Sequence, residues 1–156
     1  MSEDNEIKYT YEYFYNITIH NFYNIITEIM HDFHYAVHRG ISEIPNRRRI
    51  ETWKSSKDDT DSSLVWMEVV GEDSTIDPYI ATDVLRTMNE ENVTKLFFFT
   101  NGELTKDEKD LLDGKDHYIF TTDDIMETLT ALEKKQKSKY VKQRKTRSAP
   151  SGYVMI

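Results

Sequence analysis

One stretch of the sequence has the ligand types of a metal site. Glu28, His31, His34 and His38 follow one another at spacings of three and four residues, which would place a carboxylate and three imidazoles on adjoining turns of a helix. A single helix supplies only part of a coordination shell, and the motif does not recur elsewhere in the chain. The pattern therefore favours a solvated polar helix face over a metal centre.

Basic residues gather in two places. Arg47, Arg48 and Arg49 interrupt an otherwise acidic part, where they would grip a phosphate or a carboxylate, or offset nearby negative charge. The other group holds eight of the 20 basic residues and lies near the C-terminus: Lys134, Lys135, Lys137, Lys139, Lys142, Arg144, Lys145 and Arg147. All 28 acidic residues precede this group, and with 12 basic residues among them that part carries a net charge of −16. Attraction to a nucleic acid would therefore come from the C-terminal segment or from Arg47–Arg49.

Several classes of protein are excluded or disfavoured. The absence of cysteine excludes disulfides and thiolate metal sites. Asn101-Gly102 is a turn signal without the glycine-rich run of a phosphate loop, and no Gly-x-Ser-x-Gly elbow occurs. The first residues lack the order of a signal peptide, and no apolar run approaches the roughly 18–20 residues that cross a bilayer. We expect a cytoplasmic protein without membrane contact.

Apolar periodicity predicts alternating helices and strands. Tyrosines at every second position of residues 9–15 are typical of a strand, or of an irregular lead into the first helix. The elements expected after them are a helix over residues 21–38 ended by Gly40, strands over 48–54 and 64–70, a helix over 77–89, a strand over 94–100, a short helix over 105–112 with a capping box at Thr105 and Glu108, a strand over 117–120 and a helix over 122–132.

This order indicates an α/β domain with a mixed sheet of four or five strands, covered on both faces by helices. We assign residues 1–133 to that domain. Residues 134–156 form a basic tail without an apolar stripe, which is expected to be a frayed helical extension or a flexible arm.

Three segments carry a family resemblance. In order along the chain they are Ile50-Glu51-Thr52, Val65-Trp66-Met67-Glu68-Val69-Val70, and the stretch from Leu96 to Glu108. Together they resemble the Mrr-type branch of the restriction-endonuclease-like, or PD-(D/E)xK, fold, over roughly residues 22–132. The resemblance implies a mixed central sheet flanked by helices, with the first two segments on one hairpin.

The same resemblance implies a candidate catalytic site. Glu51 and Glu68 would hold Mg²⁺, which neutralises charge on a phosphate and activates a water. The family's lysine position is occupied by Val70, so the Glu-x-Lys pattern is incomplete. Lys54, on the same expected strand as Glu51, is the one candidate to replace it. The alternative is that Glu51 and Glu68 are solvent-facing strand residues.

These expectations favour a degenerate nuclease-fold protein, a pseudoenzyme that acts as a nucleic-acid-associated or protein-interaction module. An active Mg²⁺-dependent DNA endonuclease is one alternative, with Lys54 in the lysine's role. A structural or assembly protein tethered by its basic tail is another. The partners that fit are a nucleic acid bound by the tail, another protein or a second copy of the chain, and no cofactor beyond Mg²⁺ in the active alternative.

Overall fold

The computed structural model describes residues 9–71 and 75–147, with residues 137–147 described by their backbone alone. The elements in chain order are α1 (Tyr11–Tyr15), α2 (Ile19–Asp32), β1 (Tyr35–Ile44), β2 (Arg48–Ser55), β3 (Ser62–Glu68), α3 (Ile80–Glu91), β4 (Lys95–Thr100), α4 (Lys106–Leu112), β5 (Asp116–Phe120) and α5 (Thr122–Arg147).

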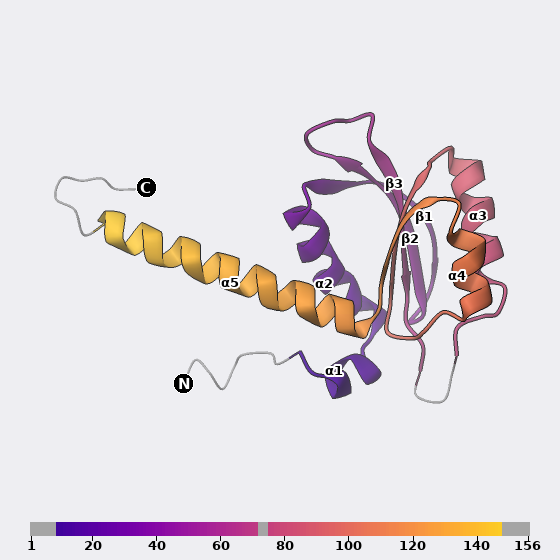
Figure 1. Ribbon diagram of the computed structural model, residues 1–156, viewed down its shortest axis with the longest axis horizontal. Coiled ribbons are helices and arrows are strands. Elements are labelled where there is room, and N and C mark those ends of the chain that lie inside the picture. The colour runs from indigo at the N-terminus through magenta and orange to yellow at the C-terminus, as the bar shows by residue number, and fades with distance from the viewer. Residues whose placement is uncertain (1–8, 72–74, 148–156) are drawn as a thin grey trace.

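The strands form one five-stranded mixed sheet in the order β1-β2-β3-β4-β5 (Figure 1). β1, β2 and β3 are antiparallel neighbours, whereas β4 runs parallel to β3 and β5 runs parallel to β4. α3 and α4 supply the crossovers that parallel neighbours require. The expected α/β class, with a mixed sheet that carries the hairpin beside the strand near residues 94–100, is confirmed.

Two apolar clusters cover the two faces of the sheet. Phe97 and Phe99 of β4 pack into the cluster beneath α1, α2 and α5, while Leu96 and Phe98 pack into the cluster beneath α3 and α4. Burying such a side chain contributes about 1.5–3 kcal/mol relative to leaving it exposed. The unbroken apolar run of β4 therefore reflects a central strand covered on both sides, as its sequence predicts.

The first long helix ends earlier than its apolar spacing predicts. α2 stops at Asp32, because His34 adopts a φ of 69°, a left-handed conformation that an α-helix does not continue. β1 then begins at Tyr35 and contains Gly40, so the expected helix end at Gly40 was wrong. Tyr35 is the one buried position of β1, and such a strand lacks the regular alternation that would have revealed it.

The end of α2 at Asp32 also separates the histidines. Glu28 and His31 remain on α2, but His34 lies in the turn after it and His38 lies on β1. His31 packs beside the ring of Trp53, with 5.9 Å between ring centroids. The four residues therefore do not share the helix face that their spacing suggested.

The tyrosine-rich lead is a short helix rather than a strand. The Thr10 side chain accepts a hydrogen bond from the Tyr13 amide at 3.2 Å and so caps α1. Phe14 is fully buried and anchors this turn in the core. The period-two pattern misled because a single buried aromatic residue, not alternate ones, fixes the segment.

α5 begins directly after β5. The amide and hydroxyl of Thr121 donate to Asp124 Oδ2 at 3.0 and 3.1 Å and so fix the first turn. The helix continues to Arg147 and extends well beyond the sheet (Figure 1). Residues 148–156 of the expected tail lie outside the described residues, and the domain boundary at residue 133 stays a prediction. No helix in the described ranges, α5 included, is long and apolar enough to cross a membrane.

Candidate functional site on the hairpin of β2 and β3

Glu68 is the last residue of β3 and is fully buried. The antiparallel register of the hairpin places it directly opposite Arg48, the first residue of β2. Arg48 Nε lies 2.6 Å from Glu68 Oε1, and its Nη2 lies 3.2 Å from Oε2. This two-pronged contact is the geometry in which a planar guanidinium matches a carboxylate.

Two further donors complete the shell of Glu68. The indole of Trp66 donates to Oε1 at 3.0 Å, and Arg47 Nε donates to Oε2 at 3.2 Å. Arg48 also lies over the Trp66 ring, 4.9 Å from its centroid. Arg47 is 45% exposed and Arg48 only 12%. Two guanidinium groups thus surround one carboxylate, and the cluster carries a formal charge of +1.

Glu51 has a similar but separate set of partners. Its Oε2 accepts from Arg49 Nε at 3.0 Å and from the Tyr23 hydroxyl at 3.2 Å, while its Oε1 accepts from the Trp53 indole at 2.9 Å. Arg49 lies over the Tyr23 ring at 3.9 Å. Burial raises the pKa of Tyr23 above its usual value, and the nearby charge of Glu51 raises it further. Each glutamate is therefore paired with an arginine and an indole.

The two glutamates lie on opposite faces of the sheet. Trp53, which alternates with Glu51 along β2, packs into the cluster beneath α2, whereas Trp66 packs into the cluster beneath α3 and α4. Glu68 is two residues beyond Trp66 on β3 and shares its face. The hairpin therefore brings each carboxylate to an arginine but does not bring the two carboxylates together.

Neither candidate lysine position completes a site. Lys54 faces the opposite side of the sheet from Glu51 and pairs with Ser62, six register steps or about 20 Å from the Arg48–Glu68 pair. Val70 lies just beyond β3, where its amide donates to Asn101 Oδ1 at 2.8 Å. Its side chain packs against the apolar cluster beneath α3 and α4.

These residues do not fit a magnesium ion. Mg²⁺ takes an octahedron of oxygen ligands, usually one or two carboxylates with free oxygens together with several waters, and the site expected from the sequence has Glu51 and Glu68 share the ion. Here the two carboxylates diverge, and the oxygens of each already accept from arginine and tryptophan. Within the described parts of the chain, no group of three or more histidine, aspartate or glutamate residues could hold a metal ion. The arrangement neutralises two buried acids rather than presenting them to a ligand.

The predicted nucleic-acid-binding residues of the tail lie along the second half of α5. Lys134 is exposed, and Lys135 Nζ lies 2.8 Å from Asp32 Oδ1. The remaining six positions follow on the helical backbone: Lys137, Lys139, Lys142, Arg144, Lys145 and Arg147. They stand apart from the hairpin that carries Arg47, Arg48 and Arg49 (Figure 1).

Sequence reasoning treated the arginines and the glutamates as separate features. The structure pairs each of the three arginines with one of the two glutamates. The register of β2 against β3 was the signal that could have revealed this pairing. If Lys54 and Ser62 are the paired residues that flank the loop between the two strands, counting back along both strands places Arg48 opposite Glu68. The face of each side chain then follows from the two-residue period of a strand.

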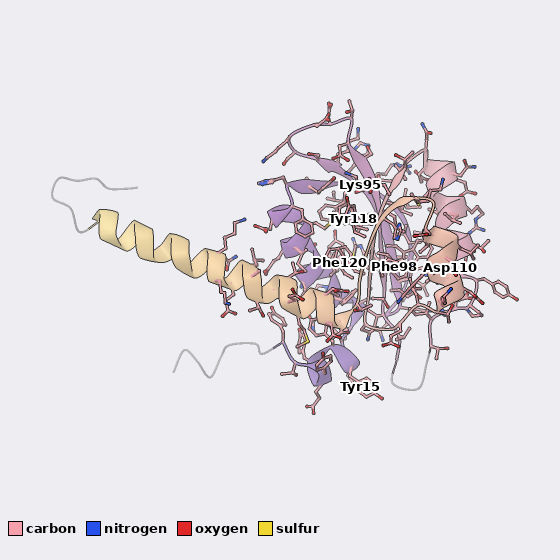
Figure 2. All side chains as sticks on the ribbon, viewed as in Figure 1. Tyr15, Lys95, Phe98, Asp110, Tyr118 and Phe120 are labelled. Carbon is pink, nitrogen blue, oxygen red and sulfur yellow. The ribbon has the colours of Figure 1, made fainter. Side chains whose placement is uncertain are left out.

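A second polar cluster, at the opposite end of the sheet, was not anticipated. Lys95 Nζ, labelled in Figure 2, lies 2.9 Å from the Tyr35 hydroxyl and 3.0 Å from Asp61 Oδ1. The Tyr35 hydroxyl in turn donates to Asp61 Oδ2 at 2.9 Å. The hydrogen bond with Tyr35 raises the pKa of Lys95, and the contact with Asp61 adds to this effect. The cluster holds a charged lysine where β4 begins.

No protein-family model matches the chain, and no curated protein sequence matches it. Among solved structures, it is similar to a chain of "MspJI Restriction Endonuclease in Complex with 27-mer Oligonucleotide", with a TM-score of 0.47 and 14% sequence identity. The similarity covers 76% of this chain and 29% of that one, so this chain spans less than a third of the enzyme's length.

Proposed function

We propose that this chain is a restriction-endonuclease-like module of the Mrr type that does not cleave nucleic acid and instead acts by binding, with a nucleic acid as its partner. The observation that carries the proposal is the pairing of Glu68 with Arg47 and Arg48 on one face of the sheet, while Glu51 pairs with Arg49 on the other.

A positive guanidinium contacts Glu68 where a nuclease would need a metal ion. Metal-dependent cleavage requires carboxylates that share one ion and a nearby cation that manages the attacking water. Loss of one such electrostatic group typically costs about a hundred- to a thousand-fold in rate. Two of these requirements are unmet here. Val70 stands in place of the lysine, and Glu51 diverges from Glu68.

The binding partner follows from the distribution of charge. The part before residue 134 carries −16 and repels phosphates, whereas residues 134–147 carry eight basic groups and no acidic one. The basic half of α5 therefore supplies the attraction to a polyanion. Arg47, which is half-exposed beside an already neutralised carboxylate, is placed to add a phosphate contact, and Arg49 is similarly exposed on the other face.

The first test is cleavage. The purified chain, incubated with plasmid or linear DNA and Mg²⁺ or Mn²⁺, is expected to show no cleavage above background. Metal-dependent nicking that disappears in both Glu68→Ala and Lys54→Ala would establish the active endonuclease instead. Cleavage that survives both substitutions would indicate a contaminating nuclease rather than this chain.

The second test is binding. Affinity for DNA or RNA should fall steeply with salt. On duplex DNA, each phosphate contact contributes about −0.9 to the slope of log K against the logarithm of the salt concentration. Replacing the eight basic residues of 134–147 by glutamine should abolish binding, whereas Arg47→Gln should weaken it by no more than one such contact. A wild-type chain without measurable nucleic-acid affinity at low salt would favour the alternative, a structural or assembly protein.

A further inference from the structure

A groove of about 560 Å³ lies between the end of α2, the edge strand β5 and the first half of α5. Its floor is aromatic: Phe33, Tyr118 and Phe120 line it, and Figure 2 labels the last two on β5. Tyr118 is 46% exposed although its ring stacks on buried Phe97 at 5.1 Å. This face of the sheet therefore has an apolar hollow beside an uncovered edge.

α5 forms one wall of this groove with a single stripe of residues. The lining positions are spaced by three, one, three, one and three residues, which is the repeat of one helix face: Asp124, Glu127, Thr128, Ala131, Leu132 and Lys135. Asp124 and Glu127 are exposed carboxylates. Among the described residues, the Glu127 side chain makes no hydrogen bond or ion pair. The wall is acidic where α5 begins.

The same stripe becomes basic where α5 leaves the sheet. Continuing the helical repeat beyond Lys135 reaches positions 138, 139, 142 and 145, which are one serine followed by three lysines in the sequence. The stripe thus has carboxylates where α5 begins, then Ala131 and Leu132, and then lysines from Lys135 onward. Such a stripe is complementary to itself when two copies run in opposite directions.

We propose that two copies of this chain associate through antiparallel α5 helices, each laying its basic half over the acidic, aromatic groove of the other. α5 spans residues 122–147, so a twofold axis at its centre lies between residues 134 and 135. That axis sets Lys142 opposite Glu127 and Lys145 opposite Asp124, and symmetry makes each pairing twice. The extension of α5 beyond its own sheet leaves its second half available for the partner (Figure 1).

This interface goes beyond the proposed nucleic-acid binding and is compatible with it, because the basic residues divide between two sides of the helix. Lys135, Lys139, Lys142 and Lys145 fall on the groove-facing stripe, whereas Lys137, Arg144 and Arg147 fall on the opposite side. Of the first set, Lys142 and Lys145 meet the partner's carboxylates, and the second set stays available for phosphates.

The test is sedimentation equilibrium of the full chain, in low salt and in about 0.5 M salt, where exposed charge pairs are screened. The wild-type chain is expected to form a dimer that weakens as salt rises. Glu127→Lys and Lys142→Glu should each raise the dimer Kd by at least about tenfold, because each reversal acts at two symmetric contacts. The combined variant Glu127→Lys/Lys142→Glu should return the Kd to near the wild-type value.

Arg144→Glu is the matched control, since it makes the same change of charge on the opposite side of the helix and should leave the dimer intact. Circular dichroism of each variant verifies that α5 and the sheet still form. A wild-type chain that stays monomeric at low salt overturns the proposal, and so does a charge-swapped variant that fails to recover. A monomer whose DNA affinity falls equally in Lys142→Glu and Arg144→Glu would assign the whole basic half of α5 to nucleic acid instead.

Discussion

Burial and pairing oppose each other at Glu68. Removing a carboxylate from water costs several kcal/mol, and the bidentate contact with Arg48 offsets much of that cost while the pair stays intact. The Trp66 indole accounts for a further contact to the same carboxylate. Arg47 makes one contact from a half-exposed position, where water screens its charge. The two arginines therefore contribute unequally, although they contact the same group.

Arg48→Met is expected to lower the free energy of unfolding by about 3–5 kcal/mol, because it leaves a buried carboxylate without its main counter-charge. Arg47→Met should cost less than about 1 kcal/mol. Urea denaturation followed by tryptophan fluorescence measures both values. The double variant Arg48→Met/Glu68→Met should recover most of the loss, since it leaves no buried charge behind. If both single variants lower the free energy of unfolding by less than about 1 kcal/mol, the Arg48–Glu68 pair is solvated rather than buried.

At the scale of single elements, α4 shows how a short helix is held. Thr105 Oγ1 accepts from the Glu108 amide at 3.2 Å, and Glu108 Oε1 accepts from the Thr105 amide at 2.9 Å. This reciprocal capping box satisfies two backbone donors that a helix of seven residues would otherwise leave open. The box was predictable from the sequence because both of its contacts lie within four residues.

Thr105→Ala removes one half of the box and is expected to lower the free energy of unfolding by about 1 kcal/mol. Thr130→Ala is a suitable control, because Thr130 is an exposed threonine inside α5 whose hydroxyl donates to the carbonyl of Met126 at 3.0 Å. Chemical denaturation of both variants at neutral pH makes the comparison. A loss in Thr130→Ala as large as in Thr105→Ala would contradict a specific role for the cap.

Local signals located the elements whose pattern is set by their own neighbours. The β2–β3 hairpin, β4 and α4 lie within a few residues of their expected positions. The end of α2 could not be placed in this way, because Phe33 and Val37 continue the helical spacing while His34 leaves the helical conformation. α1 escaped notice because its stability depends on docking Phe14 into a core formed by distant residues.

The sequence singled out the residues that form the polar contacts of the hairpin, but it did not predict how they pair, and their role as a site stays a prediction. Glu51, Glu68 and Arg47–Arg49 do form the polar contacts of the hairpin. Which acid meets which base depends on strand register and on the face of each side chain, and a single-residue slip would reverse every assignment. The cluster of Lys95, Tyr35 and Asp61 joins residues up to 60 positions apart, so no local sequence pattern predicts it.

At the scale of the whole molecule, several groups hold their protons more tightly in the folded chain. Burial is the largest cause that raises the pKa of Tyr9, Tyr23 and Tyr35, which lie just before α1, on α2 and on β1. The pKa of Lys95 is raised as well, chiefly by its hydrogen bond with Tyr35. A raised pKa contributes stability that is fully present below the unfolded value, about 10 for tyrosine, and lost as pH rises through the folded value.

The free energy of unfolding is therefore expected to be insensitive to these groups up to about pH 9 and to fall above about pH 10. Urea denaturation at a series of alkaline pH values measures this decline. Tyr23→Phe removes one of the responsible groups and should make the decline shallower. A decline as steep in Tyr23→Phe as in the wild-type chain would exclude a contribution from Tyr23.

The pairing of Arg48 with Glu68 also constrains how this sequence can evolve. Exchanging Arg48 for a carboxylate would set two acids side by side in a buried position. Removing one partner of such a pair typically costs about 3–5 kcal/mol, a large share of the roughly 5–15 kcal/mol by which a domain is stable. Losing Glu68 first leaves Arg48, 12% exposed, without its carboxylate. Losing either charged partner alone thus passes through a less stable intermediate, so selection for folding alone favours keeping the pair, whatever the module binds.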